Sequence, residues 1–269
     1  MNFRFPVACL LVGVFFFIAG AGCASSPQQP GGEMPVKNHS GISEKAVPAG
    51  TGILPTTVPS TLSITAQLTT VKSDNAIWRE AYRMFSNMKS TEYVHPPYTV
   101  DDAAGIYRFD CLGFVDHVLM NADAPGYKAI GKGVNPSIES YASYFGKLDT
   151  ITPDAAGWTK VAHPVELKPG DVCLWLTPST LDTGHMWIIA GEPRINPKRN
   201  DEVLVRIFDS SKAHSDDSRM GSAFPLGLGS GILGMMVDAE GNPAGLYWDG
   251  GTSPAGEKDT TIVCGRLDR

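Results

Sequence analysis

Apolar residues at helical spacing mark the first half of the region that can build a core. In "SDNAIWREAYRMFSNM" they fall along one stripe, and Ser73 stands where a helix N-cap belongs. This pattern predicts a helix over 74–88. The stretch "YRFDCLGFVDHVLM" shows the same spacing from Cys111 onward, and "PSIESYASYFGKL" shows it more weakly. We therefore expect three helices whose apolar stripes face the core.

The pattern changes after "LKPGD" to short runs rich in β-forming residues, separated by turn residues. These runs are "DVCLWL", "HMWIIAG", "EVLVRIFD", "GILGMMVD", "AGLYW" and "TIVCGRL", and "DAEGNP" marks a hairpin turn. Helices followed by a meander of strands are typical of an α+β fold. We expect one domain over 71–269, with the N-terminal helices packed on a roughly six-stranded antiparallel sheet.

The N-terminus has the layout of an export signal. An apolar stretch over 5–18 follows Arg4 and leads into small residues that end at Cys23. It is shorter than the roughly 20 residues that a membrane-spanning helix needs, which favours a signal peptide over 1–22. The small residues before Cys23 resemble a bacterial lipobox. This resemblance implies lipidation of Cys23 and a membrane-anchored lipoprotein of the cell envelope, in the outer membrane if the host is Gram-negative. Simple secretion and an uncleaved anchor are the alternatives.

Residues 23–70 are rich in Pro, Gly, Ser and Thr and poor in large apolar residues. Such a segment cannot bury a core, because it has too little apolar surface to offset the entropy of ordering. We expect a flexible tether that holds the domain off the membrane.

The net charge limits the classes of binding partner, and the number of cysteines limits the disulfides that can form. With 22 basic and 28 acidic residues the formal net charge is -6, so the overall charge does not favour binding to nucleic acid. Of the five cysteines, Cys9 leaves with the signal and Cys23 is the lipidation site, so Cys111, Cys173 and Cys264 remain. Three thiols allow at most one disulfide. We expect Cys173 and Cys264 to be buried free thiols, or a disulfide if their strands adjoin.

Cys111 is the candidate nucleophile. At the first turn of a helix, unpaired N–H groups and the helix dipole favour an anion and lower the pKa of a thiol. A thiol nucleophile also needs a base that a third group orients. His185 opens one predicted strand and Asp209 ends the next. If 185–190 and 203–209 pair antiparallel with residue numbers summing to about 394, His185 faces Asp209. A buried inert thiol at Cys111 is the alternative.

These residues stand in an order that resembles a known family. "FDCLGFV", "LKPGDV" and "GHMWIIAG" together resemble the NlpC family of papain-like bacterial cell-wall cysteine peptidases, over roughly 93–211. The resemblance implies a papain-like core, with Cys111 as nucleophile, His185 as general base and Asp209 as the third polar residue. It also implies hydrolysis of an amide in peptidoglycan stem peptides through a thioester, with no metal or organic cofactor.

The chain departs from the family pattern in ways that concern the substrate. Leu112 replaces a serine that helps to bind substrate in some members, and "NADAPGYKAIGKGVNP" is an expected inserted loop. Tyr98 is the nearest counterpart of a family tyrosine, with Tyr93 as a rival. We expect Tyr98, Asp110 and Leu112 to contact substrate. In "DSSKAHSDDSR", a solvated polar loop by default, Arg219 is the candidate for a substrate carboxylate.

Two other functions fit the same residues. One is a papain-like acyltransferase or an amidase on a substrate other than peptidoglycan, which Leu112 and the inserted loop would favour. The other is a catalytically silent lipoprotein that only binds cell-wall fragments. We expect a structural or surface role for His117 and a loop position for His163, and no cysteine and histidine spacing resembles a zinc site.

Overall fold

The computed structural model describes residues 73–133, 135–177, 184–257 and 260–268. The chain divides into two units, Met1–Thr57 and Val58–Arg269, and all described residues belong to the second. The predicted signal peptide over 1–22, the predicted tether over 23–70 and the predicted lipidation of Cys23 therefore lie outside the described residues. No helix in the described ranges is both long and apolar enough to cross a membrane.

The described part of the chain has a mixed α+β fold. Its α-helices are α2 (Ala76–Asn87), α3 (Cys111–Ala122), α4 (Ala124–Gly131) and α5 (Ile138–Phe145). Helices α2, α3 and α5 confirm the three helical predictions. The cap of α2 is Asn75 rather than Ser73, because the Asn75 side chain accepts the N–H groups of Ile77 and Trp78. The expected inserted loop contains α4. Asp123 caps the N-terminus of this helix.

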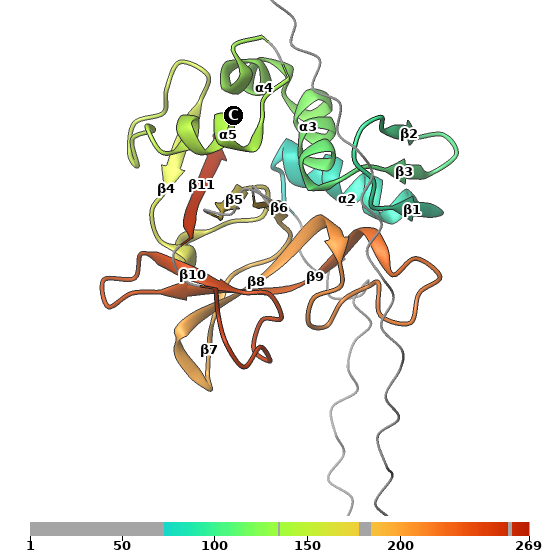
Figure 1. Ribbon diagram of the computed structural model, residues 1–269. Helices are drawn as coiled ribbons and strands as arrows, with labels where there is room; N and C mark the ends of the chain where they lie inside the picture. Colours follow the sequence, from blue (N-terminus) through green and yellow to red (C-terminus); the bar gives the residue numbers. More distant parts are fainter. Residues whose placement is uncertain (1–72, 134, 178–183, 258–259, 269) are drawn as a thin grey trace, which may run out of the picture. The chain divides into compact units, whose positions relative to one another are not determined.

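Antiparallel strands build the main sheet. In the described ranges it has eight strands in the order β10-β9-β8-β6-β5-β11-β4, with β7 paired to β8 (Figure 1). They are β4 (Trp158–Val161), β5 (Val172–Leu176), β6 (His185–Ile189), β7 (Arg194–Asn196), β8 (Arg199–Lys212), β9 (Leu226–Val237), β10 (Pro243–Tyr247) and β11 (Thr261–Leu267). The six predicted runs are β5, β6, β8, β9, β10 and β11. The sequence pattern missed β4 and β7, which have four and three residues.

A small second sheet comes just before Cys111, the candidate nucleophile, in the chain. It consists of β1 (Ser90–Glu92), β2 (Thr99–Asp101) and β3 (Ile106–Arg108), and the pattern did not predict it. After β3, the Phe109 N–H donates to the Glu92 carbonyl at 3.2 Å. The Ser210 hydroxyl of β8 donates to the Phe109 carbonyl at 2.8 Å. The first bond ties the residue before Asp110 to β1 of the small sheet, and the second ties it to β8 of the main sheet.

The main sheet separates two hydrophobic cores. Side chains alternate along β6, so Met186 and Ile188 join the core beneath the helices, whereas Trp187 and Ile189 join the core on the opposite face. Strand β10 also lies near β11, so the sheet curls around this second core. Each fully buried side chain of this size contributes about 1.5–3 kcal/mol. Helices α2–α5 lie together on one side of the sheet in Figure 1.

A disulfide joins two neighbouring strands in the second core. Cys173 of β5 and Cys264 of β11 are directly paired in the ladder and are bonded to each other. The expectation of two buried free thiols is therefore wrong, and the alternative of adjoining strands holds. Among the described residues Cys111 is the free cysteine. The unpaired thiol that the odd cysteine count required is thus the candidate nucleophile.

Candidate active site

Asp110 organises the start of α3. Its side chain caps the helix by accepting the Gly113 N–H at 2.8 Å. It also accepts the Tyr98 hydroxyl at 2.7 Å, and His95 Nδ1 lies 3.1 Å from its second oxygen. Tyr98 therefore stands beside the N-terminus of the helix that begins with Cys111. In the structure the Asp110 carboxylate holds these groups together.

The Cys111 thiol lies against the backbone of β6. The backbone N–H groups of Met186, the residue after His185, and of Leu112 lower the pKa of this thiol. Its exposed fraction is only 7%. Burial raises the pKa of the thiol to about 12, and the negative charges of Asp110 and Asp209 act in the same direction. The expectation of a lowered pKa is therefore wrong, because desolvation outweighs the helix N-terminus and the two backbone donors.

The predicted contact between base and orienter is present, in a different register. His185 Nε2 lies 2.7 Å from Asp209 Oδ2. The strand pairs Ile188↔Phe208 and Ile189↔Ile207 shift the register by two residues from the predicted one. Extending these pairs places residue 211 opposite His185, so Asp209 is its diagonal neighbour on the same face. Diagonal neighbours are still within reach of long or aromatic side chains.

The environment sets the tautomer of His185. Burial alone would raise the pKa of Asp209, but the charges of Arg219 and His214 and the histidine hydrogen bonds bring it well below the usual range. An ionised carboxylate only accepts hydrogen bonds, so His185 Nε2 carries the proton and Nδ1 is left for a reacting thiol. Burial lowers the pKa of His185, which keeps the ring neutral at rest.

Cys111 and His185 are close in the fold without being hydrogen-bonded to each other. The thiol belongs to the core beneath the helices, together with Met186. The His185 ring shares the opposite face with Trp187, at 6.0 Å between ring centroids. Within the described residues, the structure thus joins His185 to Asp209 and brings Cys111 to the same strand. It leaves the thiol and the imidazole unbonded.

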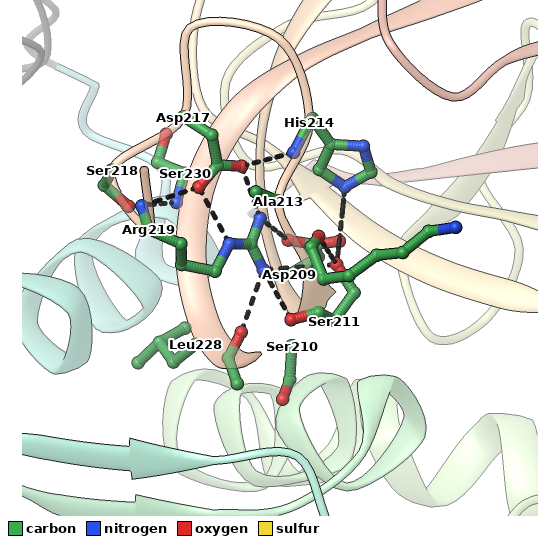
Figure 2. A network of polar contacts seen from close by, with 12 residues as sticks. Asp209, Ser210, Ser211, Ala213, His214, Asp217, Ser218, Arg219, Leu228 and Ser230 are labelled. Carbon is green, nitrogen blue, oxygen red and sulfur yellow. Dashed lines mark hydrogen bonds and ion pairs between the residues drawn. The ribbon is translucent and has the colours of Figure 1, made fainter. Parts of the chain in front are cut away.

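Arg219 is buried in a polar network and does not reach a substrate. The guanidinium lies between the carboxylates of Asp209 and Asp217 (Figure 2). Nη2 donates to Asp209 at 2.8 Å and to Asp217 at 2.6 Å. The remaining donors bind Asp217, Ser211 and Gly227, and the residue is only 3% exposed. The prediction that Arg219 binds a substrate carboxylate is wrong, because protein acceptors occupy the whole guanidinium.

His214 belongs to the same network, whereas the sequence pattern gave it only a place in the polar segment after Asp209, solvated by default or at the rim of the site. Its Nε2 lies 2.8 Å from Asp209 Oδ2 and its Nδ1 lies 2.9 Å from the Trp248 carbonyl oxygen. The segment after β8 is therefore buried at His214, Asp217 and Arg219, and the default of a solvated loop is wrong there. One sequence signal was present. Glycines alternate in "GLGSGILG" of β9, and a Cβ at Gly229 would lie 2.5 Å from Arg219 Nε.

Three of these side chains have ligand atoms close enough for a metal ion. The atoms of His185, Asp209 and His214 lie within 4.8 Å of one another. They are arranged as a hydrogen-bonded network, however, with both Nε2 atoms on one carboxylate oxygen. The Arg219 guanidinium, 2.8 Å from the same carboxylate, opposes a further cation. We assign no metal to this cluster.

A cavity of about 260 Å³ opens beside His185. Its walls are largely aromatic and include Tyr93, the rival of Tyr98 in the sequence. The residues that line it are Tyr93, Trp175, Gly184, His185, Ser211, Lys212, Leu226 and Trp248. Lys212 Nζ lies 4.9 Å from the centroid of the Trp248 ring. The predicted substrate residue Leu112 is partly buried and packs against the core beneath the helices.

Gly184 allows β6 to begin where it does. Its φ of +133° is a conformation that L side chains rarely adopt, and a Cβ would collide with the Trp175 carbonyl oxygen of β5. Glycine before His185 therefore lets the histidine enter the sheet beside the cavity.

No family model, no curated protein and no solved structure matches this chain.

Proposed function

We propose that this chain is an exported cysteine amidase or endopeptidase with a papain-like core of the NlpC type. It cleaves an amide bond in peptidoglycan stem peptides. One observation carries the proposal. The backbone N–H of Met186 acts on the Cys111 thiol, and the preceding residue, His185, has its Nε2 bound to the ionised Asp209. The candidate nucleophile thus lies against the strand that carries the candidate base and its orienter.

The protonated thiol and the neutral imidazole imply general-base catalysis rather than a preformed ion pair. As Cys111 Sγ attacks the carbonyl carbon, its proton moves to His185 Nδ1, which requires the ring to approach the thiol. Asp209 stays ionised and holds the Nε2 proton in place. His185 then protonates the departing amine nitrogen as the C–N bond breaks and the thioester forms. A water molecule gives a proton to His185, attacks the thioester and releases the thiol.

The first step builds negative charge on the carbonyl oxygen. The backbone N–H of Cys111, at the N-terminus of α3, is the donor placed to stabilise this oxyanion together with a second donor. Tyr98, which Asp110 holds beside the same helix end, contacts the substrate in this proposal.

The cavity beside His185 suits an anionic substrate with an apolar face. Its walls include Tyr93, Trp175 and Trp248, and Lys212 is the cationic residue among those that line it. Stem peptides carry carboxylates near their amide bonds. Because Arg219 is buried and its donors bind protein acceptors, Lys212 is the residue that binds the substrate carboxylate in this proposal.

The proposed location is the bacterial cell envelope, with lipidated Cys23 as membrane anchor and the segment 23–70 as tether. The disulfide between Cys173 and Cys264 supports an oxidising compartment, because such bonds are rare in reducing ones. Nucleic acid is not a partner in this proposal.

The test is digestion of purified peptidoglycan with the full chain, followed by mass spectrometry of the released fragments. We expect defined muropeptides from the unmodified protein and none from Cys111→Ala or His185→Ala. His163→Gln is the control. The His163 side chain contacts the Gly241 carbonyl, which is not one of the residues that form the candidate site. Products joined to an added amine would instead identify an acyltransferase. Wall binding by Cys111→Ala with no products from any variant would identify a silent binding protein.

A further inference from the structure

We propose that His214 is a positioning residue of this site that carries protons on both ring nitrogens and thereby balances the charge of Asp209. The protonation state follows from the network alone. Its effect on catalysis rests on the proposed function.

The first argument is the pair of acceptors that His214 faces. Nδ1 lies 2.9 Å from the Trp248 carbonyl oxygen, and Nε2 lies 2.8 Å from Asp209 Oδ2. A carbonyl and an ionised carboxylate can only accept hydrogen bonds, whereas a neutral imidazole has a single N–H. A neutral ring would therefore set a lone pair against an oxygen inside a fully buried site. The doubly protonated ring satisfies both contacts.

The second argument is the balance of buried charge. Asp209 and Asp217 contribute two negative charges, and Arg219 contributes one positive charge. All three are at most 3% exposed, as is His214. A cationic His214 brings the sum of this cluster to zero, whereas a neutral one leaves a buried carboxylate uncompensated. Uncompensated buried charge is strongly unfavourable.

The other charged groups described around His214 do not supply this positive charge in its place. Asp217 accepts the backbone N–H of His214, and Lys212 Nζ lies over the Trp248 ring, 4.9 Å from its centroid. The His185 ring lies 6.3 Å from the His214 ring between centroids. The charge on His214 lowers the pKa of both Asp209 and His185.

The consequence is a base that stays neutral and correctly oriented. A positive charge on the second ring bound to Asp209 Oδ2 disfavours a second proton on His185, so Nδ1 remains able to accept the thiol proton. The same charge keeps Asp209 ionised, which fixes the Nε2 proton of His185. His214 acts through these two residues and does not touch the substrate.

The direct test is nitrogen-15 NMR of histidine side chains in the full chain labelled with [15N]histidine. At neutral pH we expect two protonated ring nitrogens for His214 and one, Nε2, for His185. Loss of one set of signals in His214→Gln assigns the ring. A His214 ring with one unprotonated nitrogen at neutral pH would overturn the proposal. If His214→Gln does not fold, Gln variants of the other histidines assign the His214 ring by elimination.

The second test uses His214→Gln, which keeps an N–H donor for Asp209 and removes the charge. We expect His185 to take up its second proton about one pH unit higher than in the unmodified protein. The acid limb of kcat/KM should move with it. His163→Gln, the matched control, should leave both unchanged. A folded His214→Gln with an unmoved His185 titration contradicts the proposal, because a merely structural role would give that result. If the unmodified protein shows no turnover, the proposed function fails while the histidine signals still decide this inference.

Discussion

The buried, protonated thiol of Cys111 leads to a quantitative prediction for its reactivity. Burial shifts the pKa of this thiol from 9.0 to about 12. Three pH units correspond to about a thousandfold less thiolate than in an unfolded chain below pH 9, or about 4 kcal/mol. Since only the thiolate is alkylated, the folded protein should react correspondingly more slowly.

The assay is alkylation by iodoacetamide between about pH 7 and about pH 10, in buffer and in urea, with mass spectrometry of the Cys111 peptide. In the folded protein we expect the rate to rise about tenfold for each pH unit over the whole range. In urea the rise should flatten near the usual pKa of about 9.

Restricted access of the reagent lowers the rate by a constant factor and leaves this slope unchanged. Unmodified Cys173 and Cys264 peptides show that the disulfide stayed intact during the reaction. A folded-state rate that levels off below pH 9 would refute the reasoning, because it would mean that the helix N-terminus and the backbone donors outweigh burial.

Three further predictions concern other charged groups. Arg219→Gln removes the cation between Asp209 and Asp217 and leaves one buried negative charge uncompensated. It should lower the free energy of unfolding in urea by about 3–5 kcal/mol, and a loss below about 1 kcal/mol would contradict the buried network. Burial raises the pKa of Asp116 to about 7, so the stability this carboxyl contributes is present at low pH and is lost as pH rises through 7. Between about pH 4 and about pH 8, the free energy of unfolding of Asp116→Asn should therefore rise by up to about 4 kcal/mol relative to that of the unmodified protein. Parallel pH dependences of the two free energies would exclude this effect. Lys212→Glu should raise KM for a carboxylate-bearing substrate about tenfold with little change in kcat, whereas an unchanged KM would remove Lys212 from substrate binding.

Local patterns predicted much of the framework of the site. The helix that begins at Cys111 follows from apolar spacing. The structure adds Asp110 as its N-cap, which accepts the Gly113 N–H. The contact between His185 and Asp209 follows from two adjacent antiparallel strands. The register was wrong by two residues, yet the contact survived because an even shift keeps side chains on the same face.

The roles of Arg219 and His214 did not follow from local patterns. A segment as polar as "DSSKAHSDDSR" is ordinarily solvated, and its composition gives no sign that Asp217 and Arg219 are buried together. That burial depends on Asp209 of β8 as a charge partner and on the space that Gly229 leaves on β9. Both come from strands that the chain brings together only when the sheet forms.

The sequence by itself determined the α+β arrangement, the start of the helix at Cys111 and the contact between His185 and Asp209. These depend on spacing and capping within short segments, where side-chain chemistry acts over a few residues. Only the tertiary structure decided the pKa of Cys111, the pairing of Cys173 with Cys264 and the interior place of Arg219. The physical reason is that desolvation and charge pairing depend on which distant segments enclose a group.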